Sequence, residues 1–150
     1  MRYLAVILGI FGLEWKIKNY IEETKTEDTE EEKCKGMLLI RKHHNKGAFL
    51  NAGQSRRKAV AALSVLLTVF LTIFFVLTLG QAGKGLLKWG LTLLLGGAYS
   101  NTYDRLARKY VVDYVSFNVP FRLRNVIFNI GDFCIMIGAL LSALAAMEKL

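Results

Sequence analysis

Residues 59–79 form an uncharged, strongly apolar run, and this run constrains the fold of the chain more than any other feature. A helix needs about 20 such residues to cross the roughly 30 Å hydrocarbon core of a bilayer. Three cations, Arg56, Arg57 and Lys58, directly precede the run, as expected where a spanning helix meets lipid headgroups. The run therefore predicts a transmembrane helix, and a single membrane domain is the expected architecture for residues 1–150.

Three further apolar runs predict spans at residues 3–21, 86–100 and 126–147. The first run resembles a signal peptide, because an apolar stretch follows one cation, but it lacks a small-x-small cleavage site. We therefore interpret it as a retained first span. The predicted fold class is an α-helical membrane protein with four transmembrane helices.

Two longer segments connect the predicted spans. Residues 22–58 contain a short apolar run at 37–40 that suits a strand, and Gly47 and Gly53 punctuate the rest of this segment. This pattern favours a small β-rich extramembrane element after the first helix. Residues 101–125 contain the only proline of the chain and are predicted to be a loop.

The net charge of +8 comes from 20 Lys and Arg residues against 12 Asp and Glu residues. The basic residues flank apolar runs and do not alternate with aromatic residues, so we expect them to contact membrane lipids and expect no nucleic-acid partner. His43 and His44 are adjacent and lack a Cys/His partner cluster, which argues against a metal site. Cys34 and Cys134 lie in segments of different character, so no disulfide is expected.

The charges also bear on the orientation of the spans. With four spans, both termini lie on one side of the membrane, and the loops after the first and third spans lie on the other. These loops carry most of the Lys and Arg residues, so the positive-inside rule assigns them to the cytoplasm. The acidic residues of the first loop weaken this assignment without reversing it.

Three aspartates, Asp104, Asp113 and Asp132, lie beside or within apolar segments. A carboxylate at the mouth of a spanning helix is costly to ionise, which makes it a candidate functional residue. Two aspartates held close in a pocket of low dielectric cannot both ionise cheaply, so one keeps a proton and the other can take one from water. Aspartic peptide hydrolysis uses such a pair, with one ionised carboxylate as the general base and one protonated carboxyl group as the general acid. The simpler interpretation of any one of these aspartates is a residue that caps a helix or contacts solvent.

Other polar residues suit the same site. Asn101 and Asn129 can hydrogen-bond a substrate backbone or orient a carboxylate, and Arg105 can bind a phosphate or steady a carboxylate. Glu14 and Lys18 are four residues apart and fall on one helical face. They predict either a buried ion pair or a helix end at the membrane interface with a snorkelling lysine.

Five short blocks resemble the signature blocks of signal peptidase II, the lipoprotein signal peptidase family. The three C-terminal blocks, which are specific when taken together and follow the family's order and spacing, are NTYDR at 101–105, VVDY at 111–114 and FNIGD at 128–132. Two weaker blocks are NKGAF at 45–49 and the Glu14-x-x-x-Lys18 pair, which stands where the family has an Asp-x-x-x-Lys pair. The resemblance covers nearly the whole chain, including the four spans and the β-rich element.

The resemblance implies an intramembrane aspartic endopeptidase that cuts the signal peptide from a diacylglyceryl-modified prolipoprotein just before the lipidated cysteine. It assigns the catalytic pair to Asp113 and Asp132, with no cofactor. It assigns supporting roles to Glu14, Lys18, Asn45, Asn101, Asp104, Arg105 and Asn129.

The resemblance also implies where the protein acts. The family's site faces the outer leaflet of a bacterial plasma membrane, with both termini in the cytoplasm, and a monomer in contact with membrane lipids is expected. This orientation is opposite to the one that the charges favour. We give precedence to the motifs, because loops near a folded extramembrane element follow the charge rule less strictly.

The chain departs from the family pattern at several positions: NKGAF lacks one alanine of the family block, and Ser100 stands where a Gly usually precedes the Asn. Glu14 replaces an Asp, Gly131 replaces an Ala, and Phe133 replaces a small residue and adds bulk next to the second aspartate. These departures motivate an alternative function, a weak or inactive member that binds lipidated peptides as a chaperone or partner subunit. A third possibility, an ion or proton carrier, requires carboxylates in the middle of the membrane, whereas Asp113 and Asp132 are predicted at its boundary.

Overall fold

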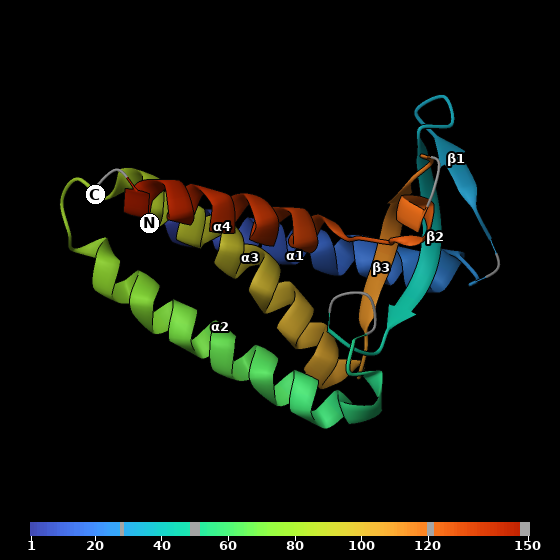
Figure 1. Ribbon diagram of the computed structural model, residues 1–150, viewed down its shortest axis with the longest axis horizontal. Helices are drawn as coiled ribbons and strands as arrows, with labels where there is room; N and C mark the ends of the chain where they lie inside the picture. The colour runs from blue at the N-terminus through green and yellow to red at the C-terminus, as the bar shows by residue number, and fades with distance from the viewer. Residues whose placement is uncertain (28, 49–51, 120–121, 148–150) are drawn as a thin grey trace.

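The computed structural model describes residues 1–27, 29–48, 52–119 and 122–147. Within these residues the chain forms four long helices that run roughly along the long axis of the molecule and a small sheet that stands across one end of them (Figure 1). The helices are α1 (Arg2–Thr24), α2 (Arg57–Leu79), α3 (Gly85–Ala107) and α4 (Ile130–Met147). The strands are β1 (Glu31–Lys33), β2 (Leu38–Asn45) and β3 (Val111–Phe117), and short 3-10 turns occur at Gln54–Arg56 and Arg122–Asn125.

The sheet is antiparallel with the order β1-β2-β3, so β2 is the central strand. Leu38 pairs with Phe117 and Asn45 pairs with Val111, with an irregularity between Ile40 and His43. The sheet therefore combines the predicted β-element after the first helix with a strand from much later in the chain. This pairing brings Asn45 to the strand that carries Asp113.

The segment at residues 101–125, predicted to be a loop, is regular over much of its length. Helix α3 continues to Ala107, and β3 starts only four residues later at Val111. The helix ends just before Lys109, whose φ of 71° lies in the left-handed region. The strand forms because Val111 and Val112 are β-branched and are buried between β2 and the end of α1.

Two of the described helices, α2 and α4, are long and apolar enough to cross a membrane, and they coincide with the predicted spans at 59–79 and 126–147. Large apolar side chains of α2 point outward; Leu66 and Phe70 are 66% and 65% exposed. So much exposed apolar surface indicates contact with lipid. Helices α1 and α3 have the same length as α2, 23 residues, but carry charged residues in their second halves.

The helices pack through one apolar cluster and several hydroxyl pairs. Ile7, Phe75, Leu91 and Leu95 form the buried cluster among α1, α2 and α3. The Thr68 hydroxyl lies 2.9 Å from that of Thr102, and the Thr72 hydroxyl lies 2.7 Å from that of Tyr99, so two polar contacts join α2 to α3. Near the sheet, Ile21 packs against Val112 and Tyr114 and thereby joins α1 to β3.

Glycines bring the backbones of α3 and α4 into direct contact. A Cβ atom on Gly97 would lie 2.2 Å from the carbonyl oxygen of Gly131, and one on Gly138 would lie 2.5 Å from that of Gly90. Small residues are typical of helix interfaces inside membranes, where close backbone approach replaces the hydrophobic driving force. The contact at Gly131 fixes the first turn of α4, which carries Asp132, against α3.

We expect Gly97→Ala to destabilise the protein by about 1–3 kcal/mol or more, because the new methyl group forces α3 and α4 apart. Gly9→Ala on α1 is the matched control, since nothing lies within 4 Å of a Cβ at that position. The measurement is the thermal unfolding of both variants in one detergent. Equal unfolding midpoints for the two variants would contradict this role of the glycine contact.

Candidate active site

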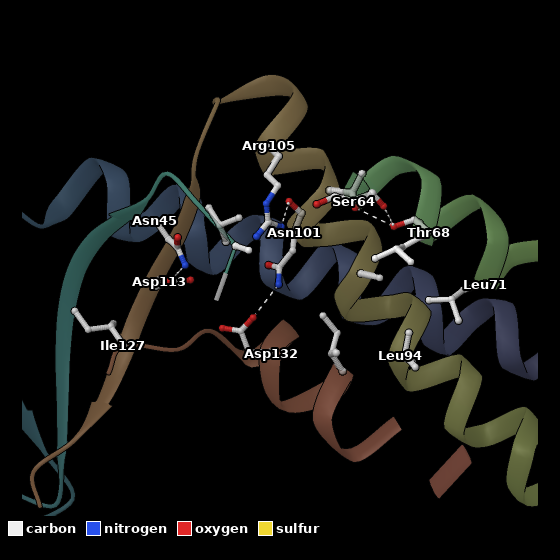
Figure 2. Close-up of a pocket in the computed structure, with 16 residues that line it drawn as sticks. Asn45, Ser64, Thr68, Leu71, Leu94, Asn101, Arg105, Asp113, Ile127 and Asp132 are labelled. Carbon is white, nitrogen blue, oxygen red and sulfur yellow. Dashed lines mark hydrogen bonds between the residues drawn. The ribbon is translucent and has the colours of Figure 1, made fainter. Parts of the chain in front are cut away.

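Asp113 and Asp132 line one cavity of about 310 Å³ (Figure 2). Asp113 comes from β3, and Asp132 comes from the first turn of α4. Asp113 is buried and Asp132 is half-buried, and they meet because β3 crosses the end of the helices where α4 begins (Figure 1). The two aspartates that the sequence singled out as a pair therefore share one pocket.

Asn129 connects the two aspartates. Its side-chain Nδ2 donates to Asp113 Oδ1 at 2.7 Å, and its Oδ1 accepts from the backbone N–H of Asp132 at 2.9 Å. In return, the backbone N–H of Asn129 donates to Asp132 Oδ2 at 3.0 Å. The last two bonds are reciprocal, as in the capping box that starts many helices. The residue that caps α4 therefore also holds Asp113, which couples the positions of both carboxyl groups.

Two further asparagines complete the support. Asn45 Nδ2 donates to Asp113 Oδ2 at 3.1 Å, and Asn101 Nδ2 donates to Asp132 Oδ1 at 2.9 Å. Figure 2 shows Asn45 beside Asp113, and Asn101 reaching down from α3 to Asp132. Each of the four carboxyl oxygens thus accepts one hydrogen bond from an asparagine. An amide donor fixes an oxygen without adding charge, and each oxygen keeps a second lone pair for a proton or water.

A buried ion network lies behind Asn101. Lys18 Nζ lies 3.2 Å from Glu14 Oε2 and 3.0 Å from Asp104 Oδ2. It also donates to Ser100 Oγ at 2.9 Å and to Asn101 Oδ1 at 3.0 Å. Lys18, Glu14 and Asp104 are exposed by only 1%, 0% and 1%. Of the two alternatives that the sequence allowed for Glu14 and Lys18, the structure therefore shows the buried ion pair and not the interfacial helix end. Since Asn101 accepts from Lys18 and donates to Asp132, the network reaches the aspartate cavity.

Tyr114 and Ser100 belong to this network, although the sequence reasoning assigned neither of them a role. The Tyr114 hydroxyl donates to Glu14 Oε1 and accepts from the backbone N–H of Ile130 at 3.2 Å, so it joins α1 to the start of α4. Burial raises the pKa of the Tyr114 hydroxyl, as do the charge and the hydrogen-bonding oxygen of Glu14, so the hydroxyl remains a donor. The available signal for Tyr114 was its position next to Asp113 in an otherwise apolar run.

Arg105 does not pair with its neighbour Asp104. Asp104 Oδ1 lies 2.9 Å from Arg108 Nε, whereas Arg105 donates to the backbone carbonyls of Asn101 and Gly47, both at 3.3 Å. Consecutive residues of a helix do not face each other, which explains the separation. Arg105 lines the aspartate cavity and ties the chain after β2 to α3 (Figure 2).

The remaining walls of the cavity are mainly apolar. They include Leu67, Leu71, Leu94, Ala98 and Ile135, together with the hydroxyl residues Ser64 and Thr68. Phe133 packs against Phe128 and Phe117, with ring centroids 5.4 Å and 6.1 Å apart. A cavity with two carboxyl groups on one wall and apolar side chains on the others suits a ligand that has both a polar backbone and an apolar part.

Burial and, to a smaller extent, the nearby Asp132 raise the pKa of Asp113 to about 7, although the hydrogen bonds from Asn45 and Asn129 act in the opposite direction. An acid whose pKa is higher in the folded state than in the unfolded chain keeps its proton longer when folded. Its contribution to stability is therefore fully present below pH 4 and is lost as the pH rises to about 7.

Asp113→Asn removes this titration, so the variant should gain stability relative to the wild type as the pH rises from 5 to 8. The expected gain is at most about 4 kcal/mol, because one pKa unit corresponds to 1.36 kcal/mol. The measurement is unfolding of both proteins in detergent across that pH range. Stability curves that run parallel would show that Asp113 ionises as easily in the folded state as in the unfolded chain.

The chain matches a family model described as signal peptidase (SPase) II over residues 6–148. A relative from Caldicellulosiruptor bescii, named lipoprotein signal peptidase, is 28% identical over 149 residues, which cover 99% of this chain and 93% of the relative. A relative from Halothermothrix orenii with the same name is 29% identical over 150 residues, which cover 99% of this chain and 97% of the relative.

Two solved structures, each described as a bacterial membrane enzyme, resemble the fold. The first has a TM-score of 0.84 at 22% identity and covers 99% of this chain and 88% of its own. The second has a TM-score of 0.78, also at 22% identity, and the match covers 99% of this chain and 94% of the solved one. The architecture of the helices and sheet is thus that of a known membrane enzyme.

Proposed function

The chain belongs to the signal peptidase II family of membrane proteases, and we propose that it is an aspartic endopeptidase that cleaves prolipoproteins. Its substrate is a precursor whose cysteine carries a diacylglyceryl group, and the bond cut is the one just before that cysteine. Asp113 and Asp132 are the catalytic pair. The observation that carries this proposal is that both carboxyl groups, each held by asparagines, line one largely apolar cavity.

The reaction needs one proton shared by the two carboxyl groups. The ionised carboxylate takes a proton from a water molecule, whose oxygen attacks the scissile carbonyl carbon, while the neutral carboxyl group donates its proton to the carbonyl oxygen. The C–N bond of the tetrahedral intermediate then breaks, and the departing amine takes up the proton that water gave. One hydroxyl group of the intermediate becomes the new carbonyl and returns its proton to the aspartate that had protonated the carbonyl oxygen. The raised pKa of Asp113 supports a pair that holds one proton near neutral pH.

The other predicted residues act by positioning. Asn45, Asn101 and Asn129 hold the carboxyl groups, and Glu14, Lys18 and Asp104 stabilise the junction of α1, α3 and α4 behind Asn101. Arg105 holds the chain after β2 at the rim of the cavity. Tyr114 joins them through its contacts with Glu14 and the start of α4.

All four helices span a bacterial plasma membrane in this proposal, and the sheet and cavity lie toward the outer leaflet. The charged residues of α1 and α3 support this arrangement, because Glu14, Lys18 and Asp104 are buried inside the bundle and do not face lipid. Ionisable residues inside membranes are tolerated in such paired, interior positions. The apolar cavity walls beside the aspartates provide room for the acyl chains or the apolar signal peptide.

The test is incubation of the purified protein with a synthetic precursor that carries the diacylglyceryl cysteine, followed by mass spectrometry. We expect a single cut just before the modified cysteine and at least about tenfold slower cleavage of the same peptide without the lipid. Binding of the lipidated peptide without any product over long incubation would contradict the enzymatic function and favour the alternative of a non-catalytic lipopeptide-binding protein.

A further inference from the structure

A second cavity, of about 360 Å³, lies beside the aspartate cavity and shares Asn45 and Arg105 with it. Its cationic lining residues are Lys46, Arg57, Lys58, Arg105 and Lys109. The described residues that line it include no acidic side chain. We call it the basic cavity. So many cations around one small volume repel each other unless an anion lies among them.

The basic cavity forms where the start of α2 meets the end of α3 (Figure 1). Arg57 and Lys58 come from the first turn of α2, which has no side-chain cap, so its backbone N–H groups add to the positive potential. The nearby acids have other partners: Glu22 pairs with Lys42, and Asp104 pairs with Lys18 and Arg108. Arg105 is attracted to Asp113 and Asp132 in the neighbouring cavity, whereas Arg57 and Lys58 form no ion pair with an acidic residue in the described part of the chain. The charges of Arg57 and Lys58 are therefore available to an anionic ligand.

The other walls of the basic cavity are apolar and come from Val60, Ala61, Ala62 and Leu106. The apolar surface continues along α2, where Leu63 and Leu66 are 54% and 66% exposed. A ligand that contacts both the cationic residues and this apolar surface has an anionic group at the helix ends and hydrocarbon chains along α2. A free inorganic anion would use only the cationic half.

We propose that the basic cavity binds the phosphate group of an anionic glycerophospholipid, whose acyl chains lie along α2. The inference rests on the membrane setting of the proposed function but not on its hydrolytic chemistry, so lipid binding and catalysis can fail separately. It also accounts for the basic residues that the proposed orientation puts on the outer side, against the usual charge bias, because lipid phosphates there neutralise them.

The test uses the full chain in nanodiscs of phosphatidylcholine that contain spin-labelled phosphatidylglycerol or spin-labelled phosphatidylcholine in trace amounts. We expect a preference for the anionic lipid that falls as salt is added. The double variant Arg57→Gln/Lys58→Gln should lower this preference roughly tenfold, since cations near a membrane surface attract anionic lipid individually. The variant Lys16→Gln/Lys84→Gln removes the same charge from residues that do not line the basic cavity, and it should retain the preference.

Three results would overturn the proposal. The first is a wild-type protein that holds both labelled lipids equally. The second is an equal loss of preference in the two double variants, which would assign the effect to net charge alone. The third is displacement of the labelled lipid by inorganic phosphate as effectively as by phosphatidylglycerol, which would make the site a plain anion site. The swap Arg57→Lys/Lys58→Arg should keep the preference and thereby show that charge, and not a folding defect, is measured. Cleavage of the lipidated precursor, assayed on the same samples, reports the proposed function separately.

Discussion

Asp113→Asn and Asp132→Asn should each lower the rate of precursor cleavage roughly 1,000-fold or more, while the protein remains folded and inserted. Asparagine has nearly the same shape as aspartate, but its amide can neither take a proton from water nor give one to the scissile carbonyl. Since the proposed reaction uses both carboxyl groups in the same step, either substitution alone is expected to cause the full loss of rate. The measurement is the initial rate at saturating lipidated precursor for each variant.

Glu31→Gln is the control for the loss of an acidic group, because Glu31 lies on the sheet and pairs with Lys25 and Lys33 there. It should cleave at the wild-type rate. Both aspartate variants should still bind the lipidated precursor, which would show that the cavity is intact. A wild-type rate from either aspartate variant would remove that residue from the catalytic pair.

Lys18→Met should destabilise the protein by about 3–5 kcal/mol, the largest stability effect that we expect from one substitution. Methionine fills a similar volume, but it leaves the buried carboxylate of Glu14 without the cation that it contacts at 3.2 Å, while Asp104 keeps only Arg108. A buried, unpaired charge costs far more than the pair itself contributes. The measurement is chemical or thermal unfolding in detergent.

Lys16→Met is the matched control on the same helix, because Lys16 is exposed. It should change stability by less than about 0.5 kcal/mol. Adding Glu14→Gln to Lys18→Met removes the unpaired charge and should recover part of the lost stability. If Lys18→Met and Lys16→Met were equally stable, the buried network would have no structural role.

The apolar patterns and short motifs of the sequence predicted much of this architecture. The uncharged run at 59–79 coincides with α2, and the blocks that contain Asp113 and Asp132 lie at one cavity. The family resemblance of these blocks is confirmed by the family match over residues 6–148. Such features are local, so a single sequence reveals them: a run of apolar side chains predicts a helix by length, and a motif carries its own spacing.

Features that depend on pairing between distant segments could not be predicted in the same way. Residues 111–117 form a strand because β2 lies beside them, and nothing within the segment reveals that partner. Asp104 pairs with Lys18 across the bundle, and its neighbours in the sequence do not reveal this distant partner. Likewise, the spacing of Glu14 and Lys18 fixed a common helix face but not whether that face was buried.

The role of Gly131 also depends on distant segments and could not be predicted from the sequence. In the sequence, Gly131 is a departure from the family pattern with no evident compensation. In the structure its carbonyl oxygen fits against Gly97, and a Cβ atom at Gly131 would lie 2.9 Å from Asn129 Oδ1 and 3.2 Å from Glu14 Oε2. Because Gly131 has no side chain, it leaves room for Asn129, the residue that hydrogen-bonds both aspartates. Only the packed structure reveals this relation.

The central claim is that Asp113 and Asp132 act as one unit on one water molecule, and a double-mutant cycle tests it most directly. The cycle compares kcat/KM for lipidated-precursor cleavage by the wild type, Asp113→Asn, Asp132→Asn and the double variant, with product detected by mass spectrometry after long incubation. If the pair acts as a unit, the double variant should be within about threefold of the slower single variant, since each single change already removes the shared reaction step. Losses that multiply in the double variant would mean that the two carboxyl groups contribute independently, which would contradict their action on a shared water molecule.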